Sequence, residues 1–161
     1  FALLLVHALI AARSLVACGR DPADLPPPDR AGPLVCVQCD MTIREDRFSA
    51  SALIDDPSGP RRVDFDDPGC LLDHQREHPE VRFRSAHVRD AGTGAWVEAD
   101  SAWFVLSDRI ATPMASGIAA YANPAEARDK AREVGEAVID LGSLREARRA
   151  FMEQRYGSPD R

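Results

Sequence analysis

Two thiols and one thioether lie within six residues of one another in the segment Cys36-x-x-Cys39-x-Met41. Thiolate and thioether sulfur are soft donors that select soft metal ions, and Cu(I) comes first among these. Cu(I) also accepts a low coordination number, so one short loop can supply most of its ligands. The sequence therefore predicts a Cu(I) site built around Cys36, Cys39 and Met41.

A second methionine, Met114, follows Pro113 in a segment of small residues. Methionine most often fills irregular gaps in a hydrophobic core, but this segment would give it few apolar neighbours. Met114 is therefore either a core residue or a further sulfur ligand.

The Cys-x-x-Cys pair also has other interpretations. In an exported protein it can form a structural disulfide, and a redox pair is a further option. Zn(II) is a third, because Cys70 and His74 lie one helical turn apart in a predicted helix. With the pair they would complete a tetrahedron of three thiolates and one imidazole, and Met41 would then have no role.

The start of the chain predicts export and lipid attachment. An apolar run of about 11 residues is too short to span a bilayer, which needs about 20. It leads into Leu15-Val-Ala-Cys18, which has the form of a lipoprotein cleavage site. We expect residues 1–17 to be a signal peptide, Cys18 to carry lipid, and residues 18–33 to be a proline-rich tether to the membrane.

Charge and motifs exclude two classes of function. The chain has a net charge of −6, whereas nucleic-acid binding requires a basic surface. It contains neither a glycine-rich phosphate loop nor a serine-nucleophile signature. We therefore expect no nucleic-acid partner and no enzymatic activity.

The remaining elements predict an α+β fold of two related strand-strand-helix-strand units followed by a C-terminal helix. The first unit, residues 34–90, has expected strands at 47–54, 61–65 and 81–88, with a helix that starts at Asp67-Pro68. The second, residues 91–161, has expected strands at 95–97, 102–106 and 137–141, with a helix from Asn123-Pro124 to about Val134. The last helix is predicted to start at the capping box Ser143-x-x-Glu146.

Several of these motifs together resemble the NosL family. They are Cys-x-x-Cys-x-Met shortly after a lipoprotein cleavage site, Val63-Asp64-Phe65 leading to Cys70, and residues 101–106 followed by Thr112-Pro-Met-Ala-Ser-Gly-Ile-Ala-Ala-Tyr121. Members of this family are membrane-anchored periplasmic copper chaperones that serve nitrous oxide reductase. The resemblance covers nearly the whole chain after Cys18.

The resemblance implies Cu(I) binding by Cys36, Cys39, Met41 and Met114, without catalysis. It also implies a periplasmic location, a copper exporter in the membrane as donor, and apo nitrous oxide reductase or its associated transporter as acceptor. One position departs from the family: Asp40 stands where glycine is common. We expect the loop to bend differently there, or the Asp40 carboxylate to act as a hard or outer ligand.

Two rival functions remain beside the copper chaperone. One is a zinc-stabilised interaction module that uses Cys36, Cys39, Cys70 and His74. The other is a disulfide-stabilised lipoprotein that binds a protein partner without metal.

Overall fold

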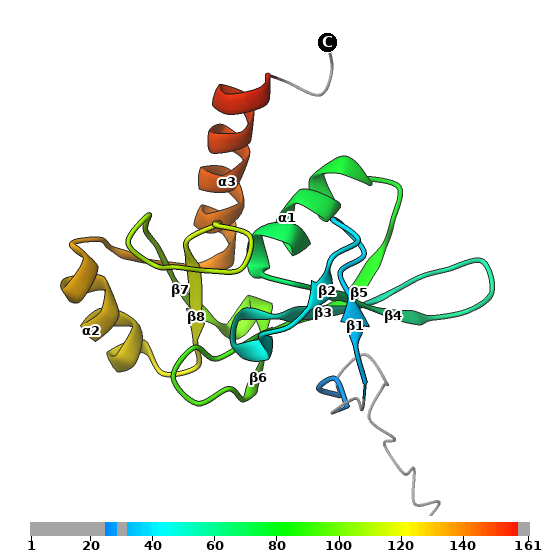
Figure 1. Cartoon of the computed structure of the whole chain (residues 1–161), viewed down its shortest axis with the longest axis horizontal. Helices are drawn as coiled ribbons and strands as arrows, with labels where there is room; N and C mark the ends of the chain where they lie inside the picture. Colours follow the sequence, from blue (N-terminus) through cyan, green and yellow to red (C-terminus); the bar gives the residue numbers. More distant parts are fainter. Residues whose placement is uncertain (1–24, 29–31, 158–161) are drawn as a thin grey trace, which may run out of the picture.

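In the computed structural model, which describes residues 25–28 and 32–157, antiparallel sheets and helices form a mixed α+β fold that ends in a long helix (Figure 1). The predicted fold class is therefore confirmed. The expected signal peptide and the expected lipid attachment at Cys18 lie outside the described residues. In the part that is described, none of the helices has the length and apolar character needed to cross a membrane.

The first unit begins with a small hairpin and supplies the first three strands of a four-stranded sheet with the order β4-β3-β5-β6. Asp67 starts its helix by accepting a hydrogen bond from the N–H of Cys70, and Pro68 occupies the first helical position. Its elements are β1 (Leu34–Val35), β2 (Thr42–Ile43), the 3-10 helix η2 (Asp46–Phe48), β3 (Ala50–Ile54), β4 (Arg61–Phe65), α1 (Pro68–Glu77) and β5 (Phe83–Arg89).

The second unit repeats this plan, because its sheet has the equivalent strand order β8-β7-β9. Asn123 caps its helix and Pro124 again takes the first helical position. Its elements are β6 (Trp96–Glu98), the 3-10 helix η3 (Ala99–Ser101), β7 (Trp103–Leu106), β8 (Ile118–Tyr121), α2 (Pro124–Val134) and β9 (Val138–Ile139).

The repeat extends to a loop near the start of each unit. In residues 36–41 and again in residues 90–95, the first residue donates its N–H to the carbonyl of the last residue, at 2.9 and 2.8 Å. The first residue also accepts a hydrogen bond from the N–H four positions on, at 2.9 and 2.8 Å. We call residues 36–41 the first loop and residues 90–95 the second loop. Cys36 in the first loop is therefore equivalent to Asp90 in the second.

The allocation of the strands differs from the prediction at two places. The strand expected at 95–97 is not the first strand of the second sheet: it is β6, which pairs with β5, Val88 lying opposite Val97. β8, which the predicted list of strands lacks, instead pairs with β7. A three-residue strand carries no local signal for its partner, because pairing across a sheet is decided by distant residues.

The C-terminal helix α3 (Leu141–Tyr156) starts earlier than predicted. Asp140, not Ser143, is its N-cap, and the Asp140 carboxylate accepts the Ser143 N–H at 2.7 Å. Leu144 in its first half is fully buried, whereas Phe151 in its second half is 45% exposed. Figure 1 shows the second half of α3 rising away from the sheets.

One buried core joins the two units. It draws Phe65, Leu71 and Val88 from the first unit, Phe104 and Ile118 from the second, and Leu144 from α3. Residues 25–28 of the predicted tether add to the first unit, since Pro27 is buried and the Leu25 carbonyl accepts a hydrogen bond from Arg62 at 3.4 Å. The shared core holds α1, the first loop and the segment before β8 in fixed relation.

Candidate metal centre

The three cysteines of the described chain meet at one point. Cys36 directly follows β1 and begins the first loop, Cys39 lies in the same loop, and Cys70 sits in the first turn of α1. Their sulfur atoms all lie within 4.8 Å of one another. Cys36 and Cys70 are buried, whereas Cys39 is partly exposed. Three thiols at this spacing can share one soft metal ion.

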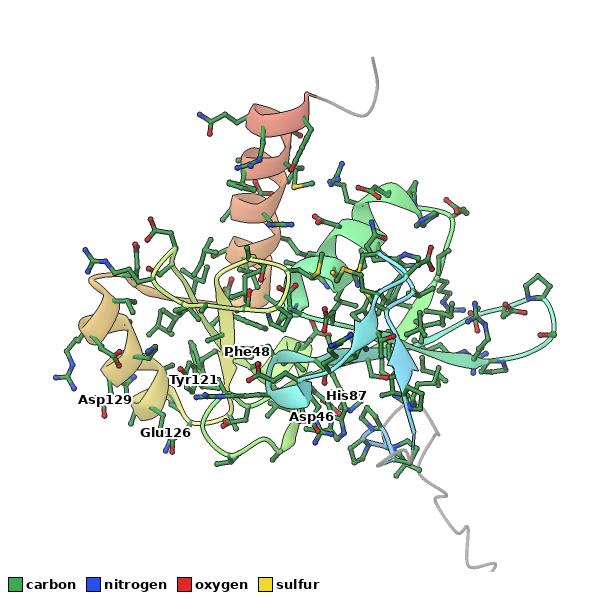
Figure 2. All side chains as sticks on the ribbon, in the orientation of Figure 1. Asp46, Phe48, His87, Tyr121, Glu126 and Asp129 are labelled. Carbon is green, nitrogen blue, oxygen red and sulfur yellow. The ribbon has the colours of Figure 1, made fainter. Side chains whose placement is uncertain are left out.

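Cys70 thus joins the pair that the sequence singled out, a position it had only in the zinc alternative. The sequence contains a signal for this position of Cys70. The strand through Phe65 is followed at once by the Asp67-Pro68 helix start, and this short connection places the first turn of α1 close to the sheet. Figure 2 shows sulfur atoms gathered where α1 approaches the segment after β1, close to the base of α3.

The first loop is held by its own backbone. Asp40 lies in the left-handed region with φ of 57°, which aspartate tolerates better than most residues. Gly94, at the equivalent place in the second loop, has φ of 75°. Asp40 therefore makes the same turn as Gly94, and a bend different from that of family members with glycine at this position stays a prediction. The Asp40 side chain is exposed.

The thiols differ in their affinity for the proton. A hydrogen bond from the Cys70 thiol, followed by backbone N–H groups of Asp66, Cys39 and Gln38, outweighs burial and lowers the pKa of Cys36 to about 5. The same hydrogen bond, with burial and the nearby Asp67 charge, raises the pKa of Cys70. Burial is the main cause that raises the pKa of Cys39. Cys36 is therefore the thiol of the cluster that gives up its proton most readily to a cation.

A buried carboxylate ties Cys70 to the segment that carries Met114. Asp67 Oδ1 accepts the Cys70 N–H at 3.1 Å, and its Oδ2 accepts the Met114 N–H at 3.3 Å. The Thr112 hydroxyl donates to the same Oδ2 at 3.0 Å. Gly69 allows the close approach, because a Cβ there would lie only 2.5 Å from Cβ of Ser116. Asp67 therefore fixes Met114 relative to the thiols.

The surroundings of Met114 fit its interpretation as a core residue, and its interpretation as a sulfur ligand stays a prediction. It packs partly buried against the shared core, and it also lines a cavity of about 370 Å³ together with Cys39 and Cys70. We call this the sulfur cavity. Met41 is 53% exposed and does not line the sulfur cavity, although its backbone forms a hydrogen bond with Cys39.

His74 does not complete the cluster. Its Nδ1 lies 3.0 Å from Oε1 of Gln38, and its ring contacts the rings of Phe65 and His78. Burial, and then the neighbouring His78, lower its pKa. Within the described residues, the group of close potential ligands contains the three cysteines and no histidine. The tetrahedral arrangement that the zinc alternative requires is therefore not assembled.

The outer wall of the sulfur cavity comes from α3. Arg148 makes two hydrogen bonds to the Asp73 carboxylate, at 3.0 and 2.6 Å, and clamps α3 to α1. The cavity is lined by Gln38, Cys39, Cys70, Asp73 and Glu77, by Met114 and Ala115, and by Arg148, Phe151, Met152, Arg155 and Tyr156 of α3.

Comparisons with known proteins agree with this architecture. The crystal structure of the copper chaperone NosL from Shewanella denitrificans matches with a TM-score of 0.58 and 19% sequence identity, over 72% of this chain and 96% of that chain. At this identity the match shows a shared fold. No match was found among curated proteins.

The sequence itself supplies the stronger comparison. The family model of NosL matches residues 32–148. That span holds both units, all three clustered cysteines, Met41 and Met114. The chain therefore belongs to the NosL family.

Proposed function

We propose that this protein is a copper chaperone that binds Cu(I) through the sulfur atoms of Cys36, Cys39 and Cys70 together with Met114 and Met41. The observation that carries the proposal is the meeting of three thiols within 4.8 Å of one another. Membership of the NosL family supports copper as the cargo. Cys70 enters the ligand set here, although the sequence favoured only the first-loop sulfurs and Met114.

Cu(I) suits this set of donors better than Zn(II). Structural zinc sites are closed tetrahedra of nitrogen and sulfur, and the imidazole of His74 is engaged by Gln38. Thioethers add affinity for Cu(I) and little for Zn(II). Met114 beside two of the thiols therefore favours copper.

The burial of the ligands suggests how copper is exchanged. Cys36 is fully buried and held by backbone N–H groups, so it stays bound to copper longest. Cys39 is partly exposed and Met41 largely exposed, so their sulfurs can leave as a partner's sulfur enters. Each step exchanges one Cu–S bond for another, and copper remains Cu(I).

We propose delivery for the assembly of the metal centres of nitrous oxide reductase, on the periplasmic side of the cell envelope. A membrane copper exporter would load the protein, and the apo-enzyme or its associated transporter would receive the copper. Lipid on Cys18 would hold the protein at the membrane surface and raise its effective concentration near both partners. This part rests on the family and on the leader motif.

The test is an anaerobic titration of the reduced protein with Cu(I) against a chromophoric chelator, with Zn(II) in parallel. We expect tight binding of about one Cu(I), weakened about 100-fold, or about 2.7 kcal/mol, by Cys39→Ser or Cys70→Ser. Met41→Ala should weaken it less. A preference for Zn(II) that is insensitive to Met41→Ala and Met114→Ala would show that the protein is a zinc-stabilised module.

A further inference from the structure

The chain contains three methionines, and the third, Met152, lines the same cavity as two of the thiols. Met152 is on α3, beyond residue 148 where the match to the family ends. It lines the sulfur cavity together with Cys39, Cys70 and Met114. With Met152, the cavity is lined by two thiols and two thioethers, which are the soft sulfur donors that Cu(I) prefers.

The position of Met152 follows from the ion pair that joins α3 to α1. On α1, Cys70 and Asp73 are three residues apart and therefore share a face. On α3, Arg148 and Met152 are four residues apart and share a face for the same reason. Because Arg148 binds Asp73 with both side chains largely buried, the two helices meet along these faces. Met152 is thus held across the cavity from the helix that carries Cys70.

Packing does not account for Met152. Met114 packs against the shared core, whereas Met152 belongs to neither of the two buried clusters of the described chain nor to the residues packed against them. Its side chain is nevertheless partly buried, since it faces the cavity. Methionine usually fills a gap in a hydrophobic core. Because Met152 does not pack in a core and lines a cavity with other sulfur atoms, a role as a metal donor explains it better.

We propose that Met152 is an additional Cu(I) donor in the sulfur cavity, which accepts the ion from Cys39 during hand-over. The proposal rests on the copper function proposed above. In the step, a bond forms between copper and the Met152 thioether while the bond to the Cys39 sulfur breaks, and copper remains Cu(I). The second half of α3, which stands clear of the sheets (Figure 1), would then be where an acceptor takes the metal.

The experiment uses the full chain labelled with ¹³C at its methionine methyl groups. Three methyl signals are expected, assigned by Met41→Leu, Met114→Leu and Met152→Leu, because leucine keeps the volume and removes the sulfur. One equivalent of Cu(I) is added without oxygen, and the rate of transfer to an acceptor chelator is measured. Gln154→Ala is the matched control, because Gln154 is exposed on the same helix and does not line the cavity.

We expect Cu(I) to shift the Met152 methyl signal and Met152→Leu to slow transfer about tenfold, whereas Gln154→Ala leaves the rate unchanged. An unmoved Met152 signal beside shifted Met41 or Met114 signals would overturn this proposal and leave the chaperone function standing. An absence of Cu(I) binding by the unsubstituted chain would overturn both.

Discussion

The first loop and the second loop have the same backbone and different chemistry. Both close with the same pair of hydrogen bonds and both bend at a residue with positive φ. Their first residues form equivalent parallel bridges, Cys36 with Asp64 and Asp90 with Ala120. Only the side chains distinguish a candidate metal site from a structural turn.

The second loop shows what the fold provides at this place without sulfur. The Asp90 carboxylate accepts backbone N–H groups of Gly92 at 2.9 Å, Thr93 at 2.7 Å and Ala122 at 2.7 Å. Burial alone would raise the pKa of Asp90, but these hydrogen bonds outweigh it and leave the pKa lowered. The turn is thus a small pocket for an anion, built from N–H groups.

In the first loop, Cys36 is held in the equivalent pocket. The backbone groups of Gln38, Cys39 and Asp66 that lower its pKa occupy the places of Gly92, Thr93 and Ala122. The fold therefore stabilises a negative charge in both units, and the residue that carries the charge decides the chemistry. The carboxylate is saturated by N–H groups, whereas the thiolate remains able to bind a soft cation.

The helices extend the contrast. Cys70 and Glu126 each lie two residues after the proline that opens α1 or α2. The Glu126 side chain is exposed, because α3 covers α1 and leaves that face of α2 open. Asp73 and its counterpart Asp129 differ in the same way. Arg148 of α3 pairs with Asp73 of α1 in a largely buried ion pair. Asp129 of α2 instead pairs with Arg132 of α2 itself, at the surface.

The largest effect is expected from converting the first loop into the second. Cys36→Asp should place a carboxylate in the same N–H pocket, so the protein should fold while losing Cu(I) affinity by about 100-fold or more, about 2.7 kcal/mol. Chelator competition measures the affinity, and thermal unfolding checks the fold. Cys36→Ala is the control, since it should lose both affinity and stability. Unchanged copper affinity in Cys36→Asp would refute the role of Cys36 as the anchor.

The next effect concerns the second loop alone. Asp90→Asn replaces a buried carboxylate that accepts three N–H groups and should lower the free energy of unfolding by about 2–3 kcal/mol, measured in urea. Because the folded pKa lies below the ordinary value near 3.8, this stabilisation is present above that pH and is lost as the pH falls through the folded pKa. The variant should lack this acid dependence but keep its Cu(I) affinity.

A smaller effect separates the two helix ion pairs. Arg148→Ala leaves a largely buried Asp73 unpaired and should cost about 2 kcal/mol of stability, whereas Arg132→Ala removes an exposed pair and should cost less than about 0.5 kcal/mol. Denaturant unfolding of both variants tests this. Equal costs would mean that α3 does not clamp α1 as the geometry indicates.

The smallest effect is expected at Asp40. Asp40→Gly gives the first loop the residue type of Gly94 and should raise stability by about 0.5–1 kcal/mol, because glycine adopts positive φ without steric cost. Gly94→Asp should lower it by a similar amount. Paired thermal unfolding of the two variants measures both changes, and a loss of stability in Asp40→Gly or a gain in Gly94→Asp would show that the loops are not equivalent.

Local signals allowed much of this fold to be predicted. Asp67-Pro68 and Asn123-Pro124 marked the starts of α1 and α2, because a cap and a proline act within one turn of helix. Two features were less predictable. β6 pairs with the first sheet, and Asp140 rather than Ser143 caps α3. Both errors arose where a short segment fits two arrangements and distant contacts choose between them.

By itself, the sequence determined which donors the protein carries and where its helices begin, because residue type and helix capping are local properties. Only the tertiary structure decided that Cys70 joins Cys36 and Cys39, and that α3 closes the cavity with Met152. Those contacts join residues far apart in the chain. They depend on how the two units share one core, and no short segment encodes that.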